Sequence, residues 1–219
     1  DMVPYTGSVL AIDPAGRGRD ETGYAVCKIL NGTLYVPAAG GLSGGYSEDT
    51  LVQLAELAKE HKVNYIVTET NFGDGMFNEL IKPVLNRIYP VSIEEVRHST
   101  QKEKRIIDTL EPVMAGHRLV VDPDVIKDDF QTIQKYPHES QLKYSLFYQM
   151  SRLTRDRGAI THDDRLDALS IAVAYWTEQL AQDAEVKMAE RKVEMLDQEL
   201  QKFQDSYFKN KGGASALTW

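Results

Sequence analysis

The sequence is poor in cysteine and has no long apolar run. Cys27 is the only cysteine in 219 residues, so no internal disulfide can form, and a reducing compartment is expected. It lies in an apolar segment, which predicts a small buried side chain rather than a reactive thiol. No stretch of about 18 apolar residues is present, and the N-terminus lacks the regions of a signal peptide. These absences argue against a membrane-spanning or secreted protein.

Basic charge is also scarce. The chain has 25 Lys and Arg against 33 Asp and Glu, a formal net charge of -8, which counts against a protein that coats DNA by general electrostatic attraction. Nucleic acid is not excluded, because an active site made of carboxylates is acidic until metal fills it. The local basic stretches Arg97–Arg105 and Arg152–Arg157 could still touch a phosphate backbone. No G-x-x-x-x-G-K-[ST] phosphate loop is present.

Alternating hydrophobic patterns predict an α/β domain. Hydrophobic residues make up 42% and charged residues 26%, as in an ordinary globular protein. Asn31-Gly32 is a strong hairpin signal between two of the expected strands. Strands are expected at Ser8–Asp13, Thr22–Leu30, Thr33–Ala38, Asn64–Thr70, Val91–Val96 and Arg118–Val121. Helices are expected at Glu48–His61 with Ser47 as N-cap, Met76–Ile88, Lys102–Ala115, Gln141–Arg155 and from near Thr161 onward.

The C-terminal part differs in composition from the rest. We expect one compact domain over residues 1–180, an amphipathic helix over 181–210 and a disordered tail over 211–219, which is rich in Gly, Ala and Ser. The helix has apolar residues in a 3-4-3-4 spacing, which forms one seam. A seam folded back on its own domain is favoured over one that binds a partner. Its members are Val193, Leu196, Leu200, Phe203 and Tyr207.

Acidic residues stand at three matching places. Asp13 ends a strand expected to be central, Glu69 lies near the end of a second strand, and the acids of 163–167 open the last long helix. If the two strands are parallel neighbours about 4.8 Å apart, both side chains can reach one ion. Asp164 and Asp167 are three apart and share a helix face, whereas Asp163 is expected to be turned away by roughly 100°. The pair Asp164 and Asp167 is therefore the better aimed.

Clustered carboxylates without cysteine or histidine favour Mg²⁺ or Mn²⁺ over zinc, because these ions prefer oxygen ligands. Two such ions about 3.5 to 4 Å apart could activate water against a phosphodiester. The candidate metal ligands are Asp13, Glu69, Asp163, Asp164 and Asp167, and all but Asp163 are also catalytic candidates. Repulsion between unpaired acids raises their pKa values, so a bound ion should stabilise the domain.

Each of these residues also has a plainer interpretation. Asp13 before Pro14 is a common turn arrangement, and Asp163 or Thr161 can simply cap a helix. The loop Asn71–Gly75, with two glycines beside Glu69, suggests mobility near substrate, although an ordinary turn is the safer interpretation. The convergence of all three acidic places, rather than any one of them, supports a metal site.

Three segments resemble a known family: Ile12–Tyr24, Thr68–Thr70 and His162–Leu169, with support from Lys102–Pro112 and Arg118–Asp122. Together they are similar to the nuclease domain of the terminase large subunit of tailed bacteriophages, especially podophages. The likeness runs over roughly residues 9–180. The spacing of Asp164 and Asp167 is also similar to the last acidic helix of Holliday-junction resolvases, which share this fold.

This resemblance implies a ribonuclease H-like fold: a mixed sheet with antiparallel hairpins leading into parallel strands, helices on both faces and a long C-terminal helix. It implies an endonuclease that cuts concatemeric double-stranded DNA during genome packaging in the host cytoplasm. The implied partners are an upstream ATPase domain, the portal protein and the small terminase subunit. The implied cofactor is Mg²⁺ or Mn²⁺, bound in a two-metal site.

Other interpretations remain open. A nucleotide-binding ATPase of the sugar kinase and actin type also places a phosphate loop after a strand ending in Asp, but it needs a second related domain. A non-catalytic docking module could use the C-terminal seam alone. A dinucleotide fold is excluded, because the third glycine is missing after Gly16-Arg17-Gly18. Arg17, Arg19 and Arg165 are candidate DNA phosphate contacts.

Overall fold

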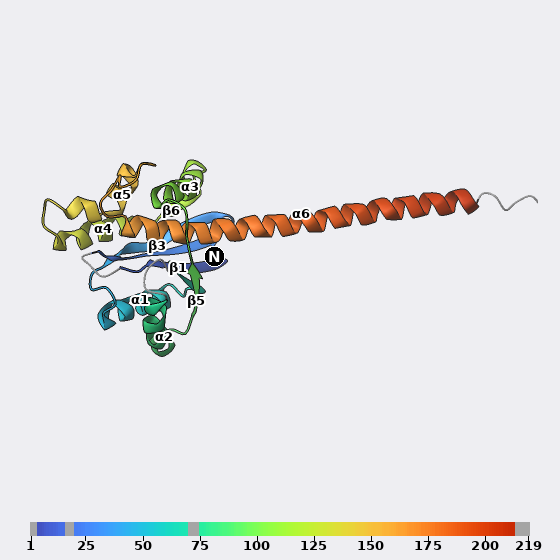
Figure 1. Cartoon of the computed structure of the whole chain (residues 1–219). Helices are drawn as coiled ribbons and strands as arrows, with labels where there is room; N and C mark the ends of the chain where they lie inside the picture. The colour runs from blue at the N-terminus through green and yellow to red at the C-terminus, as the bar shows by residue number, and fades with distance from the viewer. Residues whose placement is uncertain (1–3, 16–19, 70–74, 213–219) are drawn as a thin grey trace, which may run out of the picture. The chain divides into compact units, whose positions relative to one another are not determined.

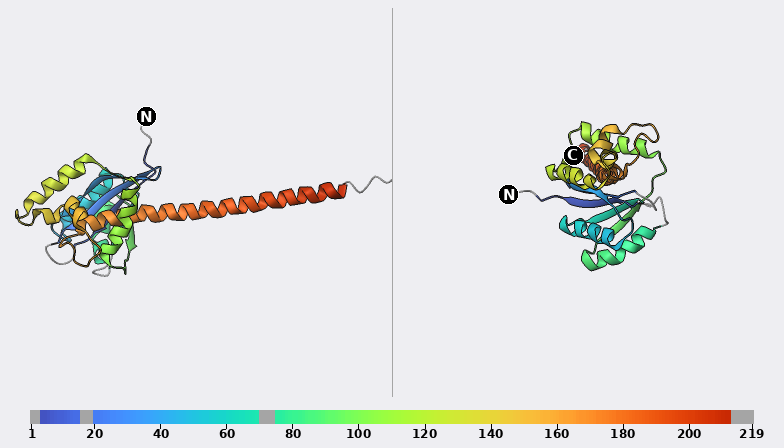
Figure 2. Two further views of the ribbon diagram at one scale, coloured as in Figure 1. Left: turned by 90° about the horizontal axis from the view of Figure 1, so that it is seen from above. Right: turned by 90° about the vertical axis from the view of Figure 1, so that its left-hand side faces the viewer.

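The computed structural model describes residues 4–15, 20–69 and 75–212, with side chains described as far as residue 201. By internal contacts the chain divides into two units, residues 1–176 and 177–219, and each is described by itself. The first unit is built around a six-stranded sheet with helices on both of its faces (Figure 1). The end-on view in Figure 2 shows the strands lying between the two helical layers.

The sheet mixes antiparallel and parallel strands, as predicted. Its order is β5-β4-β1-β2-β3-β6. β2 runs antiparallel to both β1 and β3, β4 and β5 continue parallel to β1, and β6 lies parallel to β3 at the opposite edge. The bounds are β1 Gly7–Asp13, β2 Thr22–Leu30, β3 Thr33–Leu42, β4 Tyr65–Glu69, β5 Ser92–Val96 and β6 Leu119–Val121.

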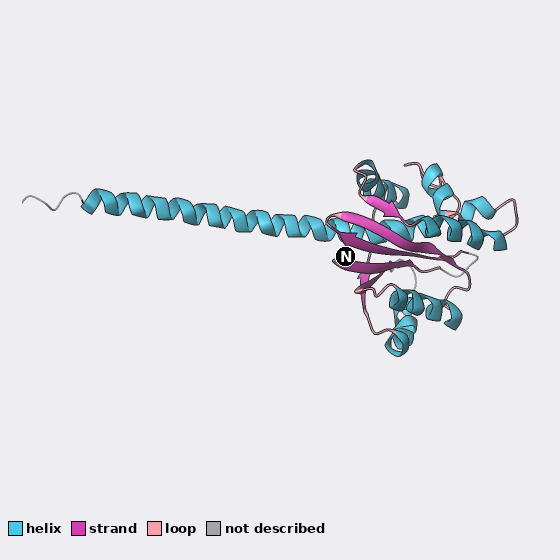
Figure 3. Cartoon of the chain, turned by 180° about the vertical axis from the view of Figure 1, so that it is seen from behind, coloured by secondary structure: helices cyan, strands magenta, loops and turns pink. Residues whose placement is uncertain are grey.

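Two groups of helices cover the sheet. One face carries the first two helices, and the other carries the remaining helices of this unit, as the view from behind also shows (Figure 3). The bounds are α1 Glu48–Glu60, α2 Met76–Ile88, α3 Lys102–Ala115, α4 Pro123–Thr132, α5 Leu146–Arg152 and α6 Asp164–Gly212, with short 3₁₀ turns η1 Ile133–Lys135 and η2 Gln141–Tyr144.

The apolar run of β1 explains its central position. Residues Val9 to Ile12 are completely buried, which requires helices on both faces, because successive side chains of a strand point to opposite sides. On one face Leu10 packs in a core with Leu54 of α1 and Ile66 of β4. The predicted N-cap of α1 is confirmed, since the Ser47 hydroxyl accepts a hydrogen bond from the Thr50 amide at 3.4 Å.

Cys27 occupies the middle of β2. Its side chain is fully buried, and burial raises the pKa of the thiol to about 12. The indole Nε1 of Trp176 donates a hydrogen bond to the Cys27 carbonyl at 3.1 Å. The prediction that this cysteine is a small buried side chain is therefore confirmed.

The predicted helix Gln141–Arg155 is wrong in its first part. Gln141–Tyr144 forms a 3₁₀ turn, and the α-helix begins only at Leu146. Ser145 between them is extended, and its hydroxyl both caps α5 and donates to the carboxylate of Asp129 at 2.6 Å. Leu142, expected on the buried stripe, is 58% exposed. A side-chain contact from a distant segment thus interrupts a pattern that favours one helix.

The last helix is longer than predicted. It begins at Asp164 rather than near Thr161, and it reaches Gly212, past the residue at which the tail was expected to start. In the second unit, described by itself, Val193, Leu196 and Leu200 are more than half exposed. The expectation that the seam folds back on its own domain stays a prediction. The side chains of Phe203 and Tyr207 lie outside the described part.

A search of the described residues for a helix long and apolar enough to pass through a bilayer finds none.

The burial pattern predicts a large effect on stability for one leucine and a small effect for another. Leu54→Ala should lower the free energy of unfolding by about 2–5 kcal/mol, because it leaves a cavity in the core between α1 and the sheet. Leu142→Ala should change it by less than about 0.5 kcal/mol, since that side chain is exposed. Urea denaturation followed by circular dichroism measures both. Equal losses for the two variants would contradict the assignment of the core.

Candidate metal centre

Two of the predicted acids meet at the carboxyl ends of neighbouring strands. Asp13 is the last residue of β1, and Glu69 is the last residue of β4. The two strands are parallel, and their register pairs Ile12 with Thr68, so the acids occupy the next position on each strand. Their side chains are 17% and 4% exposed. The strand register alone therefore brings two carboxylates side by side in a nearly dry site.

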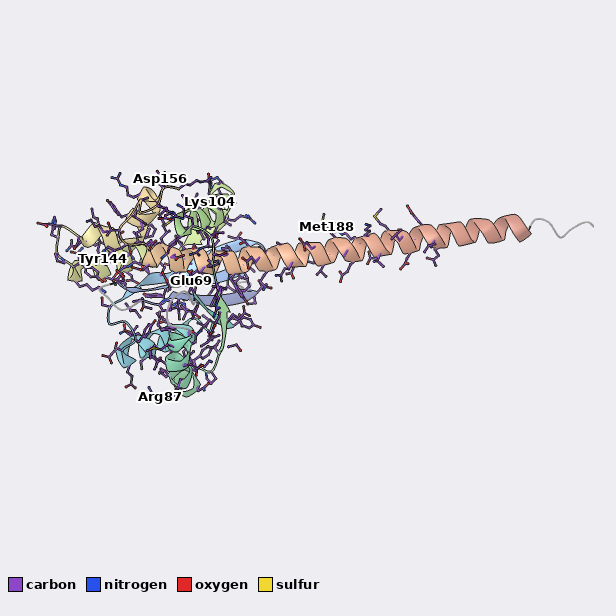
Figure 4. All side chains as sticks on the ribbon, in the orientation of Figure 1. Glu69, Arg87, Lys104, Tyr144, Asp156 and Met188 are labelled. Carbon is purple, nitrogen blue, oxygen red and sulfur yellow. The ribbon has the colours of Figure 1, made fainter. Side chains whose placement is uncertain are left out.

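Asp167, which α6 contributes, is the third carboxylate of this group. It lies in the first turn of α6, and its side chain is fully buried. One oxygen from each of Asp13, Glu69 and Asp167 lies within 4.8 Å of the others, an arrangement that could hold a metal ion. Figure 4 marks Glu69 within the first unit. The three distant stretches of sequence thus converge, as the proposed site requires.

The other two acids of the motif are placed differently from the prediction. Asp163 was expected to point away from the other acids. This expectation is wrong, because Asp163 contacts the same Lys102 ammonium group as Asp13 and Asp167. The physical reason is that Asp163 precedes the helix and its carbonyl accepts the hydrogen bond of the Asp167 amide, four residues on. Asp164 instead lies with Asp20 and His162, in a second group whose potential ligand atoms are within 4.8 Å of one another.

Two basic side chains of α3 reach into the acidic cluster. Lys102 Nζ lies 2.9 Å from both Asp163 Oδ1 and Asp167 Oδ2 and 3.5 Å from Asp13 Oδ2. Arg105 Nη2 donates to Glu69 Oε2 at 3.2 Å and to Asp167 Oδ1 at 2.8 Å. These cations hold the carboxylates together by offsetting part of their mutual repulsion.

The charge balance of the cluster remains negative. When all groups are ionised, four carboxylates face two cations, which leaves two negative charges. Burial, opposed by Lys102 and reinforced by Asp167 and Glu69, raises the pKa of Asp13 well above its ordinary value. Burial would lower the pKa of Lys102, but the surrounding carboxylates outweigh it and raise that pKa. The chemistry of this donor set fits a divalent cation bound by oxygen.

Sequence reasoning missed the roles of Lys102 and Arg105. They were noted only as part of a basic stretch that could touch DNA and of the segment Lys102–Pro112 that supports the family resemblance. A usable signal was present, because residues three apart share a face of the predicted helix, and its first turn follows a strand that lies beside the Glu69 strand. Charge complementarity with the acids was therefore available from the sequence pattern.

The predicted DNA contacts receive a mixed outcome. Arg165 is completely buried and pairs with Glu21 and Asp129, so its assignment as a DNA contact is wrong. Acidic residues on both sides of Arg165 in the sequence suggest a solvent-exposed residue. Arg165 instead lies on a side of α6 that faces the protein interior. Arg17, Arg19 and the greater part of the loop 71–75 lie outside the described residues.

The comparisons with known proteins agree with this geometry. Residues 12–119 match the family described as "Terminase Bacteriophage T7, Ribonuclease H-like domain". The large terminase subunit of Enterobacteria phage T3 is 48% identical over 180 residues, which cover 82% of this chain. The chain belongs to the terminase large-subunit family. It spans only 31% of the length of that phage T3 relative, so it corresponds to a part of a terminase subunit.

Solved terminase nuclease domains share the fold at low sequence identity. The human cytomegalovirus terminase nuclease domain, manganese-soaked and inhibitor-bound, matches with a TM-score of 0.54 and 15% identity over 78% of this chain and 83% of that one. The nuclease domain of the large terminase subunit of bacterial virus Sf6 matches with a TM-score of 0.52 and 14% identity over 77% and 88%. These structures show the shared fold, and the family model and the phage T3 relative favour a terminase domain over the sugar kinase and actin alternative.

The raised pKa of Asp164 predicts how the stability of the metal-free domain depends on pH. Burial raises this pKa from 3.8 to about 7, so between these values the folded state binds a proton that the unfolded state lacks. The free energy of unfolding should therefore fall as pH rises through that window. In Asp164→Asn this fall should be smaller by about 1 kcal/mol or more. Urea denaturation in EDTA at several pH values measures it.

Asp156→Asn is the matched control, because Asp156 is exposed at the periphery of the first unit (Figure 4). It should follow the wild-type profile. Identical profiles for wild type and Asp164→Asn would show that Asp164 carries no excess proton in the folded state.

Proposed function

We propose that this domain is a divalent-metal-dependent endonuclease that cuts concatemeric double-stranded DNA during viral genome packaging. The observation that carries the proposal is the group of Asp13, Glu69 and Asp167, whose oxygens lie within 4.8 Å of one another in a chain of the terminase family. Convergent buried carboxylates that lack sufficient counter-charge are the feature that ribonuclease H-like chemistry needs.

Asp13, Glu69 and Asp167 are the proposed ligands of one Mg²⁺ or Mn²⁺ ion, and Asp163 and Asp164 are the proposed further ligands of a two-metal site. When bound, such ions activate water and stabilise the charge that develops on a phosphodiester. The second group, formed by Asp164 with Asp20 and His162, supports a site that extends beyond the first three acids. The choice between magnesium and manganese belongs to this proposal as well.

The protein's own side chains prepare the site before any ion arrives. Arg105 is 10% exposed and stays between Glu69 and Asp167, where it keeps both carboxylates from separating. Lys102 is 37% exposed, so its ammonium group is accessible to solvent while it contacts three acids. We infer that Asp13, Glu69, Asp164 and Asp167 are catalytic. Burial raises the pKa of Asp164 to about 7 in the metal-free site, so an ion that binds this carboxylate must displace a proton near or below neutral pH.

The proposed partners follow from the family. They are double-stranded DNA, an ATPase domain upstream of this part, the portal protein and the small terminase subunit, all acting in the host cytoplasm. Arg17 and Arg19 remain proposed phosphate contacts. Arg165 is no longer one, because its guanidinium group is inaccessible to DNA.

A docking role for the second unit is a further proposal. Val193, Leu196 and Leu200 follow one helix face and are 52–58% exposed, which favours contact with another protein of the packaging machinery. This role is compatible with nuclease activity in the first unit, because it uses different residues.

Removing single carboxylates should separate activity from folding. Asp13→Asn and Glu69→Gln should each lower Mn²⁺-dependent cleavage of plasmid DNA by about 100-fold or more, because each removes a charged ligand but keeps the side-chain shape. Circular dichroism should remain that of the wild type. Glu79→Gln is the matched control, since Glu79 is exposed on α2 and pairs with Lys82. Full cleavage by both site variants, in preparations free of contaminating nuclease, would overturn the proposal.

Metal binding should also stabilise the wild-type domain directly. Mn²⁺ at 100 times its dissociation constant should raise the free energy of unfolding by about 2.7 kcal/mol, because the folded site binds the ion and the unfolded chain does not. Asp13→Asn should show a much smaller rise. Thermal melting with and without Mn²⁺ provides the measurement, and Ca²⁺ tests the effect without requiring cleavage. An unchanged Tm for the wild type would argue against a metal site.

A further inference from the structure

Arg165 lies between Asp164 and Asp167 in the sequence of α6, and its side chain is completely buried. Its Nε and Nη2 atoms donate to the two carboxylate oxygens of Glu21 at 2.8 and 3.0 Å. Its Nη1 atom donates to Asp129 Oδ1 at 2.7 Å and to Thr132 Oγ1 at 3.0 Å. One guanidinium group therefore connects the start of α6 with the residue before β2 and with α4.

The two carboxylates that bind Arg165 are themselves held in place. Glu21 Oε1 also accepts a hydrogen bond from the Tyr136 hydroxyl at 2.6 Å and contacts Lys135 Nζ at 3.0 Å. Asp129 accepts hydrogen bonds from the Ser145 hydroxyl at 2.6 Å and the Leu146 amide at 2.9 Å. Because both partners are anchored by other segments, the guanidinium plane is fixed in direction as well as position.

Glycines allow this close approach. A Cβ at Gly23 would lie 2.0 Å from the backbone oxygen of Asp164. Gly23 is also the cross-strand partner of Asp13 in the β1–β2 register. The backbone of α6 thus rests on the strand residue beside the first acid. A Cβ at Gly41 would lie 2.0 Å from Glu21 Oε2 and 3.0 Å from Arg165 Nε. Strands β2 and β3 therefore each have a glycine where a side chain would collide with α6 or with the Arg165–Glu21 pair.

We propose that Arg165 is a positioning residue whose bonds to Glu21 and Asp129 set the first turn of α6, so that Asp163 and Asp167 face Asp13 and Glu69. The inference rests on the proposed metal-dependent nuclease function. Arg165 acts through the backbone of the helix, because a fully buried side chain pinned to two carboxylates on the interior side contacts neither DNA nor an ion. A small displacement of that turn changes the separation of ligands that must bind one ion together.

The planar fork of arginine is essential to this role. A lysine keeps the positive charge but offers a single ammonium group, which cannot bind both oxygens of Glu21 and reach Asp129 in one geometry. Arg165→Lys should therefore preserve the fold better than Arg165→Met, which leaves two buried carboxylates without their cation. A residue that only stabilises the fold would lower stability without changing the properties of the folded site.

The test compares both variants with the wild-type chain by three measurements. Isothermal titration calorimetry gives the Mn²⁺ dissociation constant, steady-state plasmid cleavage gives kcat and KM, and circular dichroism gives the folded fraction. In folded Arg165→Lys we expect Mn²⁺ binding about 10- to 100-fold weaker, with kcat lowered and KM for DNA changed less than about two-fold. Raising the Mn²⁺ concentration should restore part of the lost kcat.

Arg87→Met is the matched control. Arg87 is a 62% exposed arginine of α2 that pairs with Glu48, and Figure 4 shows it far from Glu69 at the edge of the first unit. This variant should keep wild-type Mn²⁺ affinity and kcat. If Arg165→Met unfolds, Arg165→Lys decides the outcome.

The outcomes separate the two proposals. Folded Arg165→Lys with wild-type Mn²⁺ affinity and kcat overturns the positioning role and leaves the nuclease function intact. A wild-type chain that neither binds Mn²⁺ nor cleaves DNA overturns the nuclease function, and the positioning role with it. Weaker binding by Arg165→Lys, partial rescue by added Mn²⁺ and a normal Arg87→Met variant support the inference.

Discussion

Electrostatic repulsion among nearby carboxylates is the constraint on which this site depends. The parallel register of β1 and β4 places Asp13 beside Glu69, and α6 brings Asp167 to the same point. Such an arrangement is unfavourable unless cations compensate for it. Lys102 and Arg105 supply part of this compensation, and both come from one helix that follows β5. The structure thus holds acids together against their repulsion while the cluster keeps an overall negative charge when all its groups are ionised.

Two ionic networks border the first turn of α6 and have different consequences. The one formed by Lys102 and Arg105 meets the acids directly, and part of it is open to solvent. The one formed by Arg165, Glu21 and Asp129 is dry and completely enclosed. A dry network tolerates little change in geometry, because each buried charge needs its partner. A partly open network can rearrange more easily, because solvent can replace a lost partner. The buried Arg165 network therefore supports the first turn of α6 rigidly, whereas the Lys102 and Arg105 network at the same turn can adapt.

Much of the fold followed from local sequence patterns. The bounds of α2 and α3 agree with the prediction, because their apolar spacing and their flanking turns point to the same structure. The proximity of Asp13 and Glu69 could be predicted because the carboxyl ends of parallel neighbouring strands meet at one edge of the sheet. Failures occurred where distant contacts decide. Ser145 leaves the helix to bind Asp129, and β3 runs on to Leu42 through glycines that a purely local pattern marks as a strand end.

The arrangement of the motif acids also needed the structure. Helical spacing alone predicted Asp164 with Asp167, whereas the helix start at Asp164 lets Asp163 join the cluster from just outside the first turn. Arg165 could not be recognised as buried from its neighbours, because acids on either side suggest a solvated surface. Only its two partners, 36 and 144 residues away in sequence, reveal its environment.

The enclosed position of Cys27 makes this domain well suited to site-directed labelling. With a pKa of about 12 and no solvent exposure, the native thiol carries almost no thiolate at neutral pH and offers no access to a maleimide. A cysteine introduced on the surface would therefore react alone. Fluorophores or spin labels can be attached at chosen positions without first replacing the natural residue in the centre of the sheet.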